Sequence, residues 1–493
     1  MRRKTVFIIS AALYLLFSVS PFTVTEEKPS GPAFDGDRQP GKEKPYNVLL
    51  IVLDSCRADH LGYNGYQRNT SPNIDKLAKE SIVFDQAIAQ GNYTLPSFGS
   101  FLTSKYPPSL PTSNDRATLK YQINETVITL PQALKIYGYR TAAFPTGPYM
   151  APTFGFSQGF DIYTNFPFDV YKTQQIVKTE NLRFSMKEYF PTVLEYLDAH
   201  KNDKFFMLVH SNDMHMPYDY PPEYCNIFAG DYQGALSKIP IDGGLTNAMK
   251  KGGIIEVDKL RKNFPDLPLD FIPPDTKEIQ LTKTDVDYAV ARYDAGIFYA
   301  DLCVGKIVNK LEEFGLMQKT ILIIIADHGR TIYETHGGKT NRGGWGGETL
   351  YVTHTLYDEL VKVPLIIKHP KINGRRISHQ VQLVDLMPTV LGFAGIKPPA
   401  ETQGINLEPL ISGNNTVDLP ERYAYAEAGQ TERCIRTSEW KLILKDNEYE
   451  MYNLRDDPGE TKNLWDENNP PAKDLKAKLE EYSKSNTQPS GKK

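Results

Sequence analysis

Cysteine is scarce in this sequence, and the few cysteines are not spaced as metal ligands. The chain has 4 cysteines in 493 residues, and none of them forms a CxxC pair. This scarcity excludes a zinc ribbon and a dense disulfide framework. We therefore interpret the four as mostly buried thiols, although one disulfide in an oxidising compartment stays open. The four residues are Cys56, Cys225, Cys303 and Cys434.

The sequence also lacks an excess of positive charge. Its formal net charge is -4 and its isoelectric point is near 6.2, so binding driven by nucleic-acid phosphates is not expected. A composition of 40% hydrophobic and 24% charged residues excludes a disordered, collagen-like or multi-span membrane protein. The length predicts two to four folding units.

Only the N-terminus carries a long apolar run that is flanked as an export signal is. Residues 5–24 contain no charge and follow the basic start MRRK, so we predict a signal peptide over residues 1–25. Residues 26–45 are rich in proline, glycine and charge and predict a flexible linker. Because no clean cleavage site is visible, the alternative is an uncut anchor that tethers the chain to a membrane. Either way we expect export to the periplasm, to the medium or to the outer face of a membrane.

Polar residues follow three apolar runs of strand length. Residues 47–53 end at Asp54, residues 320–326 end at Asp327 and His328, and residues 205–209 lead into His210. Helical patterns such as residues 287–314 separate the runs, which predicts an α/β fold with a central, mostly parallel sheet flanked by helices. Because ligands bind beyond the carboxyl ends of such strands, we expect one site at these tips.

The pattern changes after residue 400, which divides the chain. We predict a catalytic domain over residues 46–400 and a small C-terminal α+β subdomain over residues 401–482. In the subdomain we expect a helix at residues 472–482, and the polar tail 483–493 is predicted to be disordered. The expected short strands are residues 422–427, 434–436, 441–445 and 449–453.

The predicted strand tips carry residues that suit a metal. Carboxylates of Asp54 and Asp327 and the imidazole of His328 are ligands for one divalent ion, Mn, Zn, Mg or Ca. The alternative for an aspartate at a strand end is a helix cap, which is the commoner role. These residues alone leave the choice between turn and site open.

Blocks spread over most of the chain resemble the sulfatase family of the alkaline-phosphatase superfamily. The resemblance extends from residue 47 to about residue 464 and implies an alkaline-phosphatase-like fold. The matching blocks are NVLLIVLDSCRADHLGYNGY (47–66), TSPNIDKLA (70–78), YTLPSFGSFLTSKYP (93–107), GYRTAA (138–143), GFD (159–161), HSNDMHMPY (210–218), ADHG (326–329), HTLYDELVKVP (354–364), VDLMPT (384–389) and YNLRDDPGETKNL (452–464).

The resemblance implies that Asp54, Thr94, Asp327 and His328 hold the metal and that Thr94 is the nucleophile. Sulfatases open this motif with a Cys or Ser that becomes formylglycine, and an arginine follows four residues later. Here the motif reads TLPSF, so formylglycine is not expected and Phe98 replaces the arginine. A metal-activated threonine instead resembles phosphodiesterases and phosphoethanolamine or phosphoglycerol transferases. The alternative for Thr94 is a hydroxyl that caps the following helix.

Further residues complete the predicted site. We predict His354 as the leaving-group acid and His215 as a second catalytic imidazole. For substrate contacts we predict His210, Arg57 and Arg330, with Arg57 also able to pair with Asp59. A histidine bonded to a loop carbonyl is the plain alternative for each imidazole. A second metal at Asp213, His215 and His354 ranks lower.

The sequence thus predicts a metal-dependent hydrolase of sulfate or phosphate esters, with phosphoester or phosphodiester chemistry slightly favoured. Expected substrates are esters of small molecules, glycans or lipid headgroups, and nucleic acid is not an expected partner. The alternatives are a true sulfuric-ester hydrolase, a phosphoethanolamine or phosphoglycerol transferase, and an inactive protein that binds glycans. Ser55 and His328, at positions where calcium sulfatases use Asp and Asn, favour a transition metal over calcium.

Overall fold

A nine-stranded sheet forms the centre of the molecule in the computed structural model. The structure describes residues 46–110, 122–164, 185–218, 220–242, 245, 248–250, 253–332, 336, 351–352, 355–413, 422–429 and 432–486. The strands run in the order β12-β2-β13-β9-β1-β5-β3-β4, and β14 pairs with β2. Their bounds are β1 Asn47–Leu53, β2 Ile82–Ile88, β3 Arg140–Phe144, β4 Ile162–Tyr163, β5 Phe205–Ser211, β9 Thr320–Ile325, β12 Lys362–Val363, β13 Leu365–Lys368 and β14 Arg375–Gln382.

The middle of this sheet is parallel. β1 pairs in parallel with β9 on one side and with β5 on the other, while β13 runs antiparallel between β9 and β2. All 7 residues of β1 are buried, as a strand covered on both faces requires. The predicted α/β class with a mostly parallel central sheet is confirmed.

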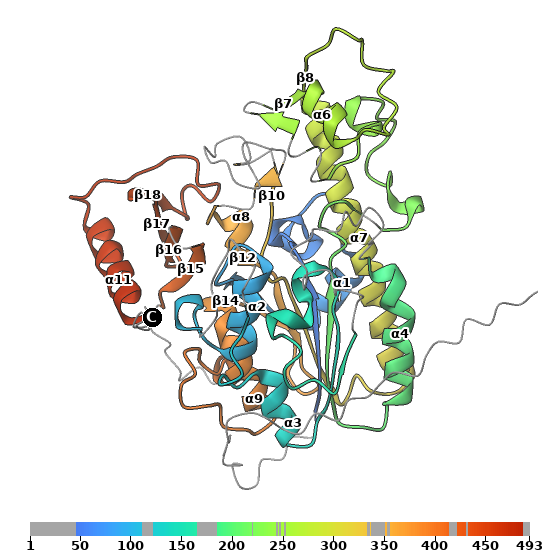
Figure 1. Ribbon diagram of the computed structural model, residues 1–493. Coiled ribbons are helices and arrows are strands. Elements are labelled where there is room, and N and C mark those ends of the chain that lie inside the picture. Colours follow the sequence, from blue (N-terminus) through green and yellow to red (C-terminus); the bar gives the residue numbers. More distant parts are fainter. Residues whose placement is uncertain are drawn as a thin grey trace, which may run out of the picture.

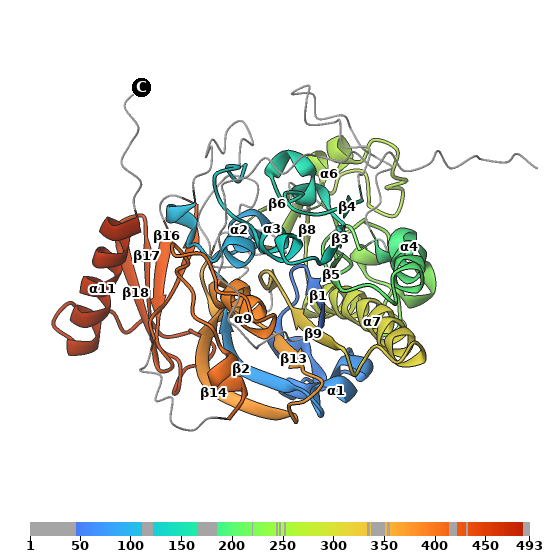
Figure 2. The same ribbon diagram turned by 90° about the horizontal axis from the view of Figure 1, so that it is seen from below.

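Helices cover both faces of the sheet. Three of them, α1 (Pro72–Ala78), α4 (Met186–Ala199) and α7 (Lys283–Glu313), pack together on one face. On the other face lie α2 (Thr94–Thr103), α3 (Leu130–Ile136) and α9 (Leu386–Phe393), and Figures 1 and 2 show the sheet between the two layers. α7 begins before the predicted residue 287 because Thr282 and Asp285 form a capping box.

The C-terminal part forms a second, antiparallel sheet with one helix. Its strands are β15 (Ala424–Ala428), β16 (Glu432–Arg436), β17 (Trp440–Lys445) and β18 (Glu448–Asn453), close to the four predicted. α11 (Pro470–Asn486) packs on β16 and β17 (Figure 1). It continues past the predicted end at residue 482, so the expectation of disorder is wrong for residues 483–486. Residues 487–493 lie outside the described residues.

Smaller elements complete the fold. A three-stranded sheet of β6 (Met249–Lys250), β7 (Ile254–Glu256) and β8 (Glu278–Gln280) was not predicted, and it lies with α6 (Val257–Asn263) at the top of Figure 1. The remaining short elements are β10 (Thr331–Ile332), β11 (Tyr351–Val352), α8 (Asp358–Val361) and α10 (Glu408–Ile411).

The structure describes the four cysteines but not the N-terminal 45 residues. All four cysteines are free, three of them buried, which confirms their interpretation as thiols. The predicted signal peptide and linker at residues 1–45 lie outside the described residues. Within the part of the chain that the structure describes, none of the helices is both long and apolar enough to cross a membrane.

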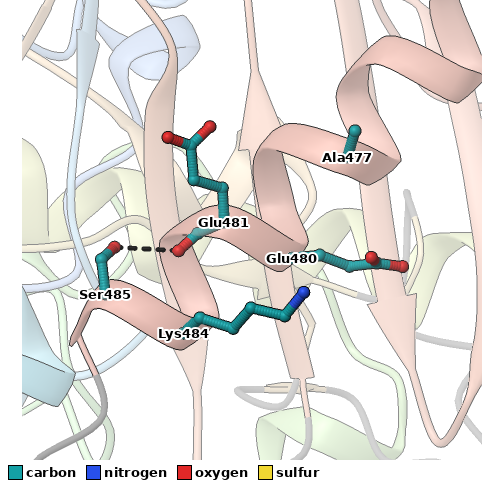
Figure 3. Close-up of a pocket in the computed structure, with 5 residues that line it drawn as sticks. All are labelled: Ala477, Glu480, Glu481, Lys484 and Ser485. Atoms are coloured by element: carbon teal, nitrogen blue, oxygen red, sulfur yellow. Dashed lines mark hydrogen bonds between the residues drawn. The ribbon is translucent and has the colours of Figure 1, made fainter.

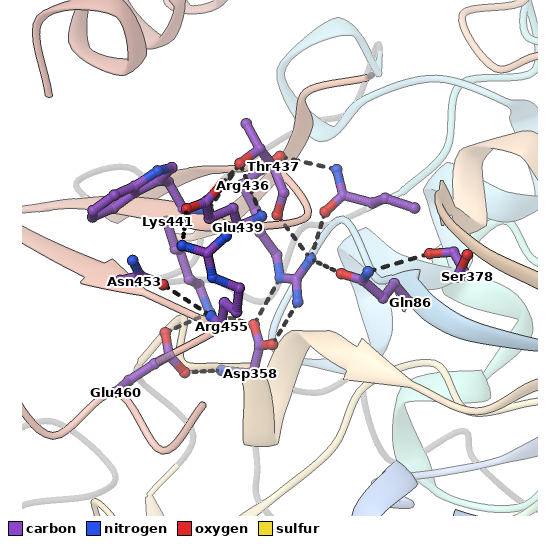
Figure 4. A network of polar contacts seen from close by, with 12 residues as sticks. Gln86, Asp358, Ser378, Arg436, Thr437, Glu439, Lys441, Asn453, Arg455 and Glu460 are labelled. Carbon is purple, nitrogen blue, oxygen red and sulfur yellow. Dashed lines mark hydrogen bonds and ion pairs between the residues drawn. The ribbon is translucent and has the colours of Figure 1, made fainter. Parts of the chain in front are cut away.

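A buried group of charges joins the two sheets (Figure 4). The Lys441 ammonium is fully buried and lies 2.9 Å from both Asp358 of α8 and Glu460. The Arg436 guanidinium binds Asp358 with two nitrogens, at 3.0 and 2.8 Å, and donates to Gln86 of β2 at 2.9 Å. Removing one member of such a group leaves another charge buried and uncompensated. The group therefore fixes the C-terminal sheet against the central one.

The contact between α7 and α1 gives a stability prediction. Asp301 of α7 is fully buried and accepts hydrogen bonds from the backbone N–H groups of Asn73 and Ile74, at 3.1 and 2.7 Å. Asp301→Ala should lower the free energy of unfolding by about 1–3 kcal/mol, because two donors in the first turn of α1 lose their acceptor. Urea denaturation measures the change.

The matched control is Asp287→Ala on the same helix. Asp287 is half exposed and, among the described residues, forms an ion pair with exposed Lys283, so its loss should change stability by less than about 0.5 kcal/mol. Equal effects of the two substitutions would contradict the capping role of Asp301.

Candidate active site

Three neighbouring strands bring their polar ends together. Asp54 directly follows β1, Asp327 follows β9 after one alanine, and His210 lies in β5 opposite Val52. Because β1 lies between β9 and β5, the three side chains meet at one edge of the sheet. Asp54, His210 and Asp327 each offer a ligand atom within 4.8 Å of the others, and all three are buried.

Thr94 lies beside this cluster as the first residue of α2. Its side chain is buried, and its hydroxyl donates to Asp54 Oδ2 at 3.3 Å. The residue before α2, Tyr93, makes no side-chain cap, and the Thr94 hydroxyl bonds to Asp54. The alternative interpretation of Thr94 as a capping hydroxyl is therefore not what the structure shows.

The hydrogen bonds of His328 identify its protonated nitrogen. Its Nδ1 lies 2.8 Å from the carbonyl oxygen of Gly329, which can only accept, so Nδ1 carries the hydrogen. In the neutral ring Nε2 then has a lone pair. That nitrogen lies 3.5 Å from Asp327 Oδ2 and 3.9 Å from Asp54 Oδ1. A lone pair and two carboxylate oxygens thus face one another, an arrangement that a cation stabilises.

The charges of the two carboxylates support the same conclusion. Burial, and then the charge of Asp54, raise the pKa of Asp327 well above its usual range. Burial also acts to raise the pKa of Asp54, but the contact with His210 outweighs it and holds that pKa below its usual range. Among the described residues, Asp327 Oδ2 has no hydrogen-bond partner although it is buried. These residues fit a divalent cation, with Asp54, Asp327 and His328 as donors.

The loop after β1 is held in an unusual conformation. Ser55 has a φ of 62°, in the left-handed region that few non-glycine residues adopt, and its N–H donates to Asp327 Oδ1 at 3.2 Å. The Tyr293 hydroxyl of α7 donates to the Ser55 carbonyl at 2.7 Å and accepts from the Arg57 N–H at 2.8 Å. This role could not be predicted from the sequence, because Tyr293 fits the pattern of an apolar helix face.

The predicted substrate-binding arginines lie in different surroundings. The buried Arg57 guanidinium pairs with Asp59 at 2.7 Å and lies 3.6 Å from Glu359. Arg330 is also buried, and its charge helps to lower the pKa values of His215 and His328. Of the two arginines, Arg330 is therefore the one whose charge changes the pKa values of the histidines at the site. Contact of either arginine with substrate stays a prediction.

The remaining predicted histidines have different outcomes. His215 Nδ1 lies 2.7 Å from the carbonyl oxygen of Met216, so Nε2 holds its lone pair. Burial, and then the charge of Arg330, lower the pKa of His215 to about 4, which keeps the ring neutral near pH 7. His354 lies outside the described residues. Its role as an acid stays a prediction.

Of the alternative site for a second metal, the structure describes Asp213 and His215, and Asp213 is engaged in other contacts. The Asp213 carboxylate accepts hydrogen bonds from the hydroxyls of Ser185 and Ser211, each at 2.6 Å, and from the N–H of Met186. Asp213 therefore caps α4 and joins it to β5. Its oxygens are occupied by these donors.

Two apolar features border the cluster. Phe98, at the position where the family motif has arginine, is fully buried and packs its ring at 77° and 5.3 Å against His210. At Gly329 the N–H donates to the Leu360 carbonyl at 2.7 Å, and a side chain there would overlap the carbonyl oxygen of Glu359. Phe98 thus packs directly on His210 of the cluster, and the absence of a side chain at Gly329 lets the Glu359–Leu360 backbone approach the residue after His328.

A hollow on α11 contains none of the predicted site residues. It is lined by Ala477, Glu480, Glu481, Lys484 and Ser485, as Figure 3 shows. The Ser485 hydroxyl donates within the helix to the Glu481 carbonyl at 2.9 Å. Because its groups are ordinary solvated side chains of one helix, we place the site at the strand ends.

Comparisons with known proteins agree with this architecture. The profile of the family named Sulfatase matches residues 46–396, and that of the N-sulphoglucosamine sulphohydrolase C-terminal region matches residues 346–486. The N-acetylglucosamine-6-O-sulfatase of Bacteroides thetaiotaomicron is 25% identical over 491 residues, covering 86% of this chain and 84% of that protein. The iduronate 2-sulfatase of Homo sapiens is 24% identical over 415 residues, covering 72% and 70%.

Solved structures share the fold. A structure in complex with its substrate D-glucosamine-2-N,6-O-disulfate has a TM-score of 0.67 at 21% identity and covers 91% of this chain and 100% of its own. The phosphonate monoester hydrolase of Agrobacterium radiobacter has a TM-score of 0.62 at 18% identity, with 90% and 95% covered. Fold and comparisons together define a sulfatase-like ester hydrolase of the alkaline-phosphatase superfamily. The chain belongs to the sulfatase family.

The donor set gives a prediction about metal binding. Purified chain should bind about one equivalent of Mn²⁺ or Zn²⁺, and Asp327→Asn should weaken binding by more than about 100-fold. Even changes outside the ligand shell weaken metal sites by about 10- to 100-fold, so removing a ligand charge should do more. Elemental analysis and calorimetric titration of chelator-treated protein measure both quantities. Asp301→Asn, a buried carboxylate of α7, is the control, and an equal loss there would contradict the assignment.

Proposed function

We propose that this enzyme hydrolyses phosphate or sulfate esters with a divalent metal and with Thr94 as nucleophile, and that phosphodiester chemistry is favoured. The observation that carries the proposal is the hydrogen bond from the Thr94 hydroxyl to Asp54, beside Asp327 and His328. When bound, a divalent cation stabilises negative charge on the Thr94 oxygen and on the ester's non-bridging oxygens. Asp54, Thr94, Asp327 and His328 would hold it.

The chemistry of threonine supports a phosphoryl group. In the proposed step Thr94 Oγ1 gives its proton to solvent water and bonds to phosphorus, while the P–O bond to the leaving group breaks and the leaving alkoxide takes a proton from a donor in the site. We keep His354 as the proposed proton donor. Water or an acceptor alcohol then displaces the threonine oxygen, which regenerates the enzyme or completes a transfer. Formylglycine hydrate has a second hydroxyl whose ionisation expels sulfate, and threonine has no such group.

The balance of charges favours a substrate group with one negative charge. Two carboxylates, Asp54 and Asp327, offset a divalent metal, while the lowered pKa values keep His215 and His328 neutral. The buried Arg330 guanidinium adds a positive charge that acts on both histidines. A phosphodiester, a phosphonate monoester or a sulfate monoester carries one negative charge, whereas a phosphate monoester carries about two near pH 7.

A second candidate is the hydrolysis of sulfuric esters. Both named curated relatives are sulfatases, one acting on N-acetylglucosamine-6-O-sulfate and one on iduronate 2-sulfate by their names. Sulfated glycans therefore belong among the substrates to test. We also retain the proposals that the chain is exported and that its N-terminus serves as signal or membrane tether.

Substitution of the nucleophile tests the mechanism. Thr94→Ala should lower kcat by about three orders of magnitude or more, because no other group can form the covalent intermediate. Thr94→Ser keeps the hydroxyl and should retain measurable turnover. Release of nitrophenol from bis(4-nitrophenyl) phosphate measures both. Turnover that is indifferent to Thr94→Ala would refute the threonine mechanism.

A panel of nitrophenyl esters tests the charge of the substrate. Bis(4-nitrophenyl) phosphate and 4-nitrophenyl phenylphosphonate should be cleaved with kcat/KM at least about tenfold above 4-nitrophenyl phosphate, because one additional charge is repelled at the site. The sulfate ester in the same panel separates the two candidates. A preference for the dianionic monoester would contradict the charge balance, and the absence of both bound metal and turnover would favour the glycan-binding alternative.

A further inference from the structure

The contacts of His210 differ from those of the other histidines at the cluster. His210 is fully buried, and its Nδ1 lies 3.2 Å from the backbone nitrogen of Thr146, two residues beyond the end of β3. A backbone N–H can only donate, so Nδ1 must accept and cannot carry a hydrogen. The neutral ring of His210 therefore carries its hydrogen on Nε2.

The orientation of this N–H is fixed from several sides. The Thr146 hydroxyl donates to the His210 carbonyl at 2.8 Å, which holds the two backbone segments together. Phe98 packs against the ring at 77°. Nε2 then lies 3.3 Å from Asp54 Oδ2, the oxygen that also accepts from Thr94. Three elements, α2, β5 and the segment after β3, thus determine where the N–H points.

A protonated Nε2 cannot bind a metal. His210 lies within the distances of a possible ligand group with Asp54 and Asp327, but its lone pair on Nδ1 is occupied by Thr146. His328 and His215 have the opposite arrangement, with hydrogen on Nδ1 and a lone pair on Nε2. Distance alone would therefore select the wrong histidine as ligand.

The Nε2–H group has capacity for a further acceptor. Although it is 3.3 Å from Asp54 Oδ2, it makes no hydrogen bond of good geometry to any described residue. A buried donor that lacks an acceptor is unfavourable by about 1–3 kcal/mol, which an incoming oxygen would recover. The proposed nucleophile, the Thr94 oxygen, lies 3.3 Å from the same Asp54 Oδ2.

We propose that Thr146 locks His210 as the Nε2–H tautomer, so that His210 is a fixed neutral hydrogen-bond donor to a non-bridging oxygen of the ester, and is not a metal ligand. The proposal rests on the function proposed above and specifies how the site binds the ester. It also provides a hydrogen-bond donor near Phe98, the position where the family motif has an arginine. A neutral donor suits an ester with a single negative charge.

Nitrogen NMR of the full chain tests the tautomer directly. With ¹⁵N-labelled histidine, the nine histidines give two-bond H–N patterns that distinguish Nε2–H from Nδ1–H rings, and His210→Gln identifies the His210 pattern by its loss. We expect the Nε2–H form, unchanged when one equivalent of Zn²⁺ is added. His328, identified with His328→Gln, should shift on the same addition. An Nδ1–H pattern for His210, or a metal-bound shift of its Nε2, would overturn the proposal.

Variants test the role of the donor. His210→Leu should keep about one equivalent of metal but lower kcat by about 10²- to 10³-fold, the usual effect of losing one donor to an oxyanion. His210→Gln should recover part of the loss, because its amide can donate from a similar position. Thr146→Val keeps the backbone N–H and should leave the tautomer unchanged. Loss of metal in both His210 variants would show a ligand instead.

The two proposals fail separately. Absence of turnover with every ester would refute the proposed function, whereas the wild-type NMR pattern would still decide the tautomer. If His210→Leu does not fold, that same pattern and its response to Zn²⁺ still support or overturn the role of His210.

Discussion

The repulsion between two buried carboxylates is the constraint on which the rest of the site depends. Asp54 and Asp327 end neighbouring strands of the parallel sheet, where water is excluded and like charges repel strongly. Ser55 offers its N–H to Asp327, and Thr94 offers its hydroxyl to Asp54. A site built around this repulsion is ready for a cation. The Tyr293 hydroxyl, bonded to the Ser55 carbonyl, holds the loop after β1 in place against this repulsion.

The three histidines at the site differ in which ring nitrogen carries the hydrogen. Carbonyl partners put the hydrogen of His328 and His215 on Nδ1 and turn a lone pair toward the cluster. A backbone N–H partner does the reverse for His210. The backbone therefore assigns ligand and donor roles to chemically identical side chains. Such assignments require no change in the pKa of any ring.

The sequence was sufficient for the sheet and for the strand tips, but not for the contacts between them. Asp54, Asp327 and His328 could be placed because each follows an apolar run, and all parallel strands end at the same edge. The contact of Thr146 with His210 could not, because it depends on which strand lies beside β5. Likewise Tyr293 reaches Ser55 across 238 residues of chain. Local patterns contain no information on such partners. The predicted start of α7 at residue 287 was too late for a local reason, because a capping box of Thr282 and Asp285 begins the helix at Lys283.

Gly329 has a consequence for how this enzyme can change in evolution. Its backbone lies against the segment around Glu359, whose carboxylate is 3.6 Å from Arg57 and 2.9 Å from His336. His336 in turn bonds to the carbonyl oxygen of Glu460, in the segment after β18. Any side chain at residue 329 would force these parts away from His328. The position is thus closed to substitution for steric reasons, independent of the reaction catalysed. Diversity of chemistry in this architecture must arise elsewhere, at residues such as Thr94, Phe98 and His210, which line the cluster without joining it to the C-terminal half.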